Sequence, residues 1–292
     1  MIRKSDQVRI ETVQCLSPDG LHKMAYKEWG QPDNPHVLVC VHGLTRVSDD
    51  FDVLARELSE QYRVICPDVV GRGRSSWLKN PQNYQVPQYV ADMVTLLARL
   101  RATHVDYLGT SMGGLIGMGL ASLRDNPIKK LILNDIGPSL DVAALNRISQ
   151  YVSQPLRFAT FGEGAQYIRS ISLTFGEHSE EEWHKLCKDV LRQDKDGMWI
   201  RHHDLNLGLA MQAITPELAQ AAQVMMWSAF DSISCPTLLL RGADSDLLSK
   251  ETAQQMTRRG PKVKLVEFEK VGHAPTLVHA DQIEPIRQFL SS

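Results

Sequence analysis

The chain has 292 residues, of which 43% are hydrophobic and 23% are charged, the balance of an ordinary globular protein. A chain of this length can bury a sizeable core, so its folding needs neither disulfides nor a structural metal. The formal net charge is −2 and no basic block is present, which argues against nucleic acid as a partner.

The N-terminal segment and the cysteines bear on location. Arg3 and Lys4 have no apolar stretch behind them, and no segment reaches the apolar length of a membrane span. We therefore expect neither a signal peptide nor a membrane partner. The five cysteines show no paired spacing, and Cys40 and Cys66 lie inside apolar runs, as is typical of buried free thiols. A reducing compartment, the cytoplasm, is the predicted location.

Short, nearly continuous apolar runs alternate with stretches of helical periodicity along most of the chain. Such runs are typical of strands buried on both faces of a parallel sheet. The predicted strands are His36–Val41, Arg63–Cys66, Val105–Leu108, Lys130–Leu133, Thr237–Leu240 and Val263–Phe268. The predicted helices cover residues 50–58, 90–100 and 113–123 and a C-terminal stretch from Ile283 to Leu290. This alternation predicts an α/β fold with a mostly parallel, doubly wound sheet.

One segment, residues 138–231, breaks this alternation. It has no convincing strand run and contains only helical pieces. The clearest begins at Ser179, which forms a capping box with Glu182, and a second runs from Ala144 to Tyr151. We predict a helical insertion at 138–231 within a core formed by residues 1–137 and 232–292.

The strongest chemical signal is the G-x-S-x-G sequence from Gly109 to Gly113, which follows a predicted strand and precedes a helix. A sharp strand-to-helix turn strains the central serine and leaves room only for glycine two positions to either side. The turn exposes the Ser111 hydroxyl above the sheet, where the helix N-terminus favours negative charge. Ser111 is therefore the predicted nucleophile.

A second signal is His42-Gly43-Leu44, directly after the strand that ends at Val41. This loop can direct the Leu44 backbone N–H toward Ser111, and together with the Met112 N–H it would form an oxyanion hole. His42 itself is interpreted as a structural residue that bonds within its own loop.

The predicted general base is His273, in the loop after the last strand. A base there would take the Ser111 proton and return it to the leaving group. An acid after the preceding strand would orient the imidazole, and Asp244 and Asp246 both lie there.

The chain resembles the α/β-hydrolase superfamily over nearly its whole length, and within it the bacterial carboxylesterases with a helical cap. The segments that carry this resemblance are Val41–Arg46, Pro67–Ser75, Gly109–Gly114 and Asn134–Pro138. The resemblance implies a serine hydrolase without a metal or organic cofactor, whose cap at 138–231 shapes the substrate pocket.

The resemblance leaves the acid open between three positions. Many family members carry it three residues after the strand-end glycine, and this chain has Ser245 there. We favour Asp246, because the apolar residues that follow resemble the stretch after the family's acid, with Asp244 as the alternative. Some relatives carry the acid one strand earlier, which would be Asp135, but a loop-fixing carboxylate is the favoured interpretation of that residue.

The predicted function is hydrolysis of short to medium acyl esters, including small polyester oligomers, through an acyl-enzyme (the carboxylesterase class, EC 3.1.1). Arg46 either binds a polar substrate group or braces its loop. His202, His203 and Asp204 are interpreted as packing or solvent-facing residues, not as metal ligands. Two alternatives remain: a C–C bond hydrolase of a vinylogous diketone with the same triad, and a ligand receptor that kept the fold.

Overall fold

The computed structural model describes residues 8–212 and 216–292 of the chain. Its centre is an eight-stranded sheet with the strand order β1-β2-β4-β3-β5-β6-β9-β10. The strands are β1 (Arg9–Ser17), β2 (Gly20–Trp29), β3 (Val37–Val41), β4 (Arg63–Pro67), β5 (Val105–Thr110), β6 (Ile128–Asn134), β9 (Thr237–Gly242) and β10 (Lys264–Phe268). From β4 to β10 all neighbours run parallel, and β2 joins β4 antiparallel. The predicted α/β fold with a mostly parallel sheet is thus confirmed.

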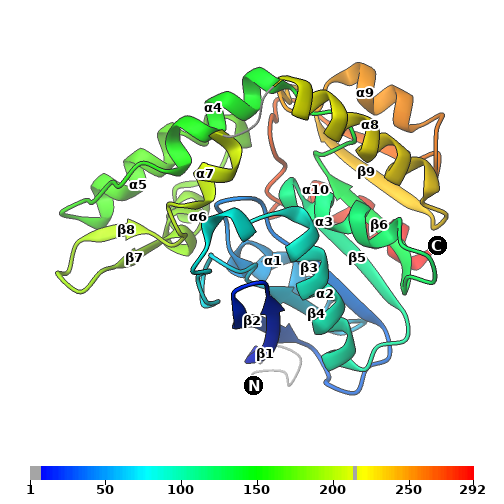
Figure 1. Ribbon diagram of the computed structural model, residues 1–292, viewed down its shortest axis with the longest axis horizontal. Helices are drawn as coiled ribbons and strands as arrows, with labels where there is room; N and C mark the ends of the chain where they lie inside the picture. The colour runs from blue at the N-terminus through cyan, green and yellow to red at the C-terminus, as the bar shows by residue number, and fades with distance from the viewer. Residues whose placement is uncertain (1–7, 213–215) are drawn as a thin grey trace.

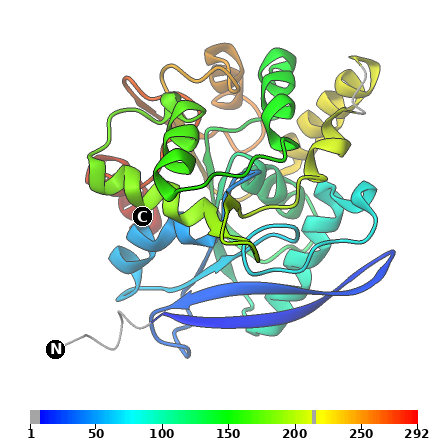
Figure 2. The same ribbon diagram turned by 90° about the vertical axis from the view of Figure 1, so that its left-hand side faces the viewer.

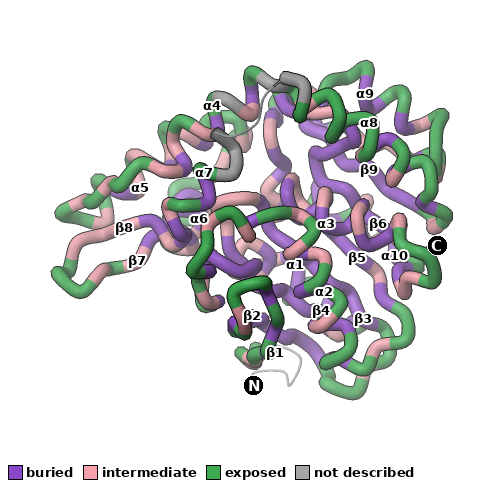
Figure 3. The backbone as a smooth tube through the Cα atoms, viewed as in Figure 1, coloured by how far each residue is buried: buried purple, intermediate pink, exposed green. Residues whose placement is uncertain are grey.

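Helices cover both faces of the sheet (Figure 1). They are α1 (Asp52–Leu58), α2 (Val86–Leu100), α3 (Met112–Ala121), α8 (Pro216–Ser232), α9 (Lys250–Met256) and α10 (Ala280–Ser291). Alternate residues of β3 show how the faces divide. Val39 and Val41 join the apolar cluster beneath α2 and α3, whereas Leu38 and Cys40 join the cluster beneath α1 and α10. β3 and β9 are buried along their whole length (Figure 3).

A hairpin of β1 and β2, which was not predicted from the sequence, forms one edge of the sheet (Figure 2). Buried and exposed residues alternate along β1, so it lacks the continuous apolar run by which the other strands were identified. That alternation is typical of a strand with one face in water.

The segment between β6 and β9 contains α4 (Val142–Val152), α5 (Phe161–Ser170), α6 (Glu180–Val190), α7 (Leu207–Gln212) and the hairpin of β7 (Leu191–Gln193) and β8 (Trp199–Arg201). The capping box of Ser179 and Glu182 is present at the start of α6. The hairpin corrects the expectation of helices alone, because strands of three residues are too short to show a periodicity. A small apolar cluster around Trp183 and Leu186 joins α5, α6, β7 and β8.

The insertion predicted at residues 138–231 includes α8 up to its last residue but one. This helix contacts α3, and its Trp227 and Phe230 belong to the larger apolar cluster of the core. Figure 1 shows α8 beside the core, whereas α4 to α7 project to one side. We keep the name cap for residues 138–212. No helix in the described ranges combines the length and the apolar character that a membrane span requires.

Candidate active site

Ser111 lies at the turn between β5 and α3, with φ 52° and ψ −116°. This backbone conformation is rarely adopted by a residue with a side chain, and its strain is typical of functional sites. A Cβ atom on Gly109 would overlap the backbone of Gly113, and one on Gly113 would overlap the carbonyl of Val41. The two glycines therefore permit the turn that presents the Ser111 hydroxyl.

His273 lies between Ser111 and a carboxylate. Its Nε2 is 2.8 Å from the Ser111 Oγ, and its Nδ1 is 2.7 Å from Oδ2 of Asp135. Two hydrogen bonds to backbone carbonyls fix the loop that carries His273. Asn134 donates to the Pro275 carbonyl at 2.8 Å, and Thr174 of the cap donates to the His273 carbonyl at 2.9 Å.

Asp135 follows β6 directly and is completely buried, with a positive φ of 57°. Asp and Asn tolerate this left-handed conformation better than most residues. Its Oδ1 accepts a hydrogen bond from the Gly242 backbone N–H at 2.9 Å, and its Oδ2 accepts one from the Ser245 hydroxyl at 2.6 Å. The loop after β9 thus holds the carboxylate in place with donors and does not supply the carboxylate.

The position of Asp246 differs from the expectation. It is exposed and forms an ion pair with Arg147 of α4, and Asp244 is exposed as well. Leu247 and Leu248 are both buried, and they anchor the loop so that Ser245 faces inward and Asp246 outward. One signal in the sequence could have indicated Asp135. The family's usual acid position after β9 holds Ser245, and Asp135 is the acid that directly follows the neighbouring strand β6.

The loop of the predicted oxyanion hole is fixed by His42 and Arg72. The His42 Nε2 accepts from the Val69 N–H at 2.9 Å, so its Nδ1 donates to the Gly43 carbonyl at 2.7 Å. Burial lowers the pKa of His42, which keeps the ring neutral as this bonding requires. Arg72, also buried, donates to the Leu44 carbonyl at 2.8 Å. Arg72 lies in the segment Pro67–Ser75, which carries part of the family resemblance.

Leu44 lines the cavity beside Ser111, and Met112 is the first residue of α3. Amides at the first turn of a helix have no acceptor within the helix. Met112 therefore adjoins the serine in the chain, and Leu44 lines the same cavity.

A cavity of about 470 Å³ opens between the core and the cap above Ser111. Its volume is in the range of pockets that hold small organic ligands. The walls include Leu44, Arg46, Ser111 and His273 from the core, and Arg147, Tyr151, Ile168, Leu173, Phe175, Arg201 and His203 from the cap.

Arg46 lines this cavity, but its guanidinium is already engaged. It forms two hydrogen bonds with the Asp50 carboxylate, at 2.6 and 2.8 Å, and donates to the Leu186 carbonyl of α6 at 3.1 Å. Of the two expected roles, this geometry fits the bracing of the loop, with an additional contact to the cap.

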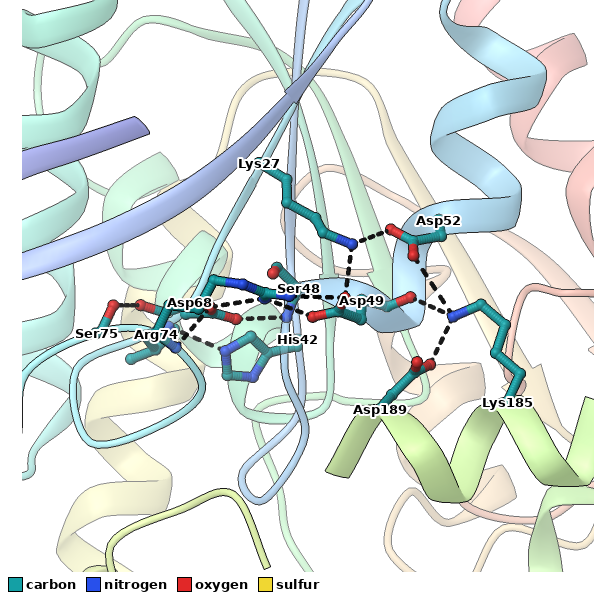
Figure 4. A network of polar contacts seen from close by, with 11 residues as sticks. Lys27, His42, Ser48, Asp49, Asp52, Asp68, Arg74, Ser75, Lys185 and Asp189 are labelled. Carbon is teal, nitrogen blue, oxygen red and sulfur yellow. Dashed lines mark hydrogen bonds and ion pairs between the residues drawn. The ribbon is translucent and has the colours of Figure 1, made fainter. Parts of the chain in front are cut away.

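A network of charged residues fastens α6 to the core (Figure 4). Lys185 of α6 donates to the Asp49 backbone oxygen at 2.8 Å and pairs with Asp189 at 2.6 Å. Lys27 of β2 pairs with both Asp49 and Asp52 at 2.6 Å. Burial raises the pKa of Asp189 to about 6. The α6 side of the cap is therefore attached through several linked charges.

Cys15, His22 and Asp92 could bring three metal-ligand atoms within 4.8 Å of one another. These buried residues lie on β1, β2 and α2 and do not line the cavity. The His22 Nε2 and Asp92 are hydrogen-bonded to each other at 3.0 Å. His203 and Asp204, weighed above as ligands, instead bond to the Val152 carbonyl and to the Tyr84 hydroxyl.

The fold and the site together define a hydrolase. The family described as the alpha/beta hydrolase fold matches residues 36–280, and the chain belongs to that family. A 3-hydroxybutyrate-oligomer hydrolase from Cupriavidus necator is 52% identical over 286 residues, which are 97% of this chain and 98% of that protein. Esterase YbfF from Escherichia coli is 26% identical over 272 residues, covering 88% of this chain and 94% of its own length.

Solved structures of hydrolases also resemble this chain. A putative hydrolase from Rickettsia typhi is 32% identical, with a TM-score of 0.87 over 98% of this chain and 99% of its own. An α/β hydrolase from Novosphingobium aromaticivorans is 34% identical, with a TM-score of 0.85 over 97% of this chain and 98% of its own. These comparisons support an ester hydrolase of the α/β-hydrolase family.

Proposed function

We propose that the protein is a serine esterase that cleaves short esters, and oligomers of 3-hydroxybutyrate in particular. The observation that carries this proposal is the hydrogen-bonded series Ser111–His273–Asp135 beside the cavity between the core and the cap. The substrate class is suggested by the 52% identical relative, whose named substrate is a polyester oligomer. An oligomer of two or three units is small enough for a cavity of about 470 Å³.

In this mechanism His273 accepts the proton of Ser111 through Nε2 as the serine oxygen attacks the ester carbonyl. Asp135 accepts a hydrogen bond from Nδ1–H, which holds the reactive tautomer and stabilises the imidazolium that forms. The Leu44 and Met112 amides stabilise the oxyanion.

Collapse of the tetrahedral intermediate breaks the bond to the leaving oxygen, which takes the proton from His273. Water, activated by the same imidazole, then hydrolyses the acyl-enzyme and regenerates the Ser111 hydroxyl. None of these steps needs a metal or an organic cofactor. We propose a reducing compartment such as the cytoplasm as the location, in keeping with five free cysteines.

The test is hydrolysis of p-nitrophenyl butyrate and of the 3-hydroxybutyrate dimer and trimer by the wild type and by Ser111→Ala. We expect the wild type to cleave all three, with a burst of p-nitrophenol that reports the acyl-enzyme. Ser111→Ala is expected to lose roughly 10⁴- to 10⁶-fold in kcat. A wild type that is inert toward every ester would overturn the proposal and favour C–C bond hydrolysis or ligand binding.

A further inference from the structure

Three arginines line the cavity, and they differ in how their charge is compensated. Arg46 is paired with Asp50, and Arg147 is paired with Asp246. Arg201 has no carboxylate partner among the residues that the structure describes. Asp50 is the acidic residue in the cavity wall, and its carboxylate is already occupied by Arg46.

Arg201 lies at the end of β8 and is 5% exposed. Its guanidinium donates to the backbone carbonyls of Tyr151 and Gln154 at 2.6 Å and of Val152 at 3.2 Å. Tyr151 and Val152 are the last two residues of α4 and Gln154 follows it, so the guanidinium lies at the helix C-terminus, where the dipole favours a cation. The carbonyls are neutral, however, so they satisfy hydrogen bonds without cancelling the charge.

Two further features leave the charge of Arg201 uncompensated within the protein. The Nε atom of Arg201 is buried without a hydrogen-bond partner in the described part of the chain. The neighbouring His203 also lines the cavity and contributes no negative charge. A buried cation without a counterion costs free energy, and an anionic ligand in the cavity would recover it.

We propose that Arg201 binds the free carboxylate of the substrate, so that the enzyme acts preferentially on acidic esters such as the carboxyl-terminated oligomers of a hydroxy acid. This inference rests on the proposed function and adds a specificity residue to it. In a dimer the carboxylate would belong to the leaving alcohol, because the acyl part of such a molecule carries the free hydroxyl. Arg201 then orients the substrate, while Ser111 and His273 perform the chemistry.

The test compares two forms of the 3-hydroxybutyrate dimer, the free acid and the primary amide of its carboxyl end. The wild type is expected to show a kcat/KM at least about 10-fold higher for the acid, since a hydrogen bond to a charged group is stronger than one between neutral groups. Equal rates for the two forms, or a faster amide, would overturn the inference.

Arg201→Gln should remove this preference, because the amide side chain can still donate to the α4 carbonyls but carries no charge. The matched control is Arg157→Gln, which makes the same exchange at an exposed cap residue paired with Asp194 and Asp196 outside the cavity. It should keep the preference. Retention of the preference in Arg201→Gln, with native circular dichroism, would contradict the assignment.

A binding measurement separates this inference from the proposed function. In Ser111→Ala, calorimetry measures the affinity of the uncleaved acid and amide without any need for turnover. Tighter binding of the acid supports the role of Arg201 even if ester cleavage fails, and equal binding overturns it. If the enzyme cleaves p-nitrophenyl butyrate but shows no preference for the free-acid dimer, the inference about Arg201 is wrong and the proposed esterase function still stands.

Discussion

The ends of β6 and β9 lie side by side at the carboxyl edge of the sheet, and each is followed by an aspartate. After β6, Asp135 is fully buried and bonded to His273, Gly242 and Ser245. After β9, Asp246 is exposed and paired with Arg147 of the cap. The comparison teaches that the environment of a carboxylate, and not its distance along the chain from a strand end, decides what it can do.

The largest effect in this comparison is expected from Asp135→Asn. An amide at this position would donate to Nδ1 of His273 and stabilise the wrong tautomer, so that Nε2 could no longer accept the Ser111 proton. We expect kcat for p-nitrophenyl butyrate to fall roughly 10³- to 10⁴-fold. Native circular dichroism serves as the control, and an activity near that of the wild type would show that another group orients His273.

A second experiment transfers the acid to the other strand end. Ser245→Asp in the Asp135→Asn background places a carboxylate where the Ser245 hydroxyl now lies, 2.6 Å from Oδ2 of Asp135. We expect activity to recover to within about 100-fold of the wild type, because a misplacement of about 1 Å costs about that factor. No recovery in a folded double variant would mean that the loop after β9 cannot direct an acid toward His273.

Ser245→Ala tests the donor without removing the acid. It deletes a hydrogen bond to a buried carboxylate, which is worth about 1.5–3 kcal/mol. We expect roughly a 10-fold loss of kcat and a lower melting temperature. Ser245→Thr, which keeps the hydroxyl, is the matched control and should retain more activity than Ser245→Ala.

The smallest effect is expected from Asp246→Asn. Its ion pair with Arg147 is exposed to water, and such pairs contribute about 0–1 kcal/mol to stability. Both kcat and the melting temperature should stay close to those of the wild type, with kcat within about twofold. A loss of kcat comparable to that of Asp135→Asn would show that Asp246 is the acid, as predicted from the sequence.

The core strands could be predicted because burial on both faces produces continuous apolar runs, as in β3 and β9. The hairpin β1–β2 and the short pair β7–β8 could not be identified in this way. The first alternates between buried and exposed residues, and the second is too short to show any period. The boundary at residue 231 stays a prediction, because apolar residues of α8, such as Trp227, fit a cap interior as well as a core surface.

The site was predictable where local sequence determines local geometry. The glycines around Ser111 and the loop position of His273 are such cases, and the structure brings these two side chains together. The carboxylate that contacts His273 could not be predicted in the same way. Asp135 is 138 residues from His273, and its selection depends on a left-handed backbone and on donors from β9, neither of which leaves a local pattern.

The packing of α8 on α3 has a consequence for protein engineering. Ser111 and Asp135 precede the cap and His273 follows α8, so a chimaera that exchanges only residues 138–212 would keep all three and the core helix α8. The junctions would lie after β6 and between α7 and α8. Such a cassette would carry Arg147 and Arg201 with it. The preference for one ester over another could then be exchanged between relatives while Ser111, Asp135 and His273 stay in the unchanged core.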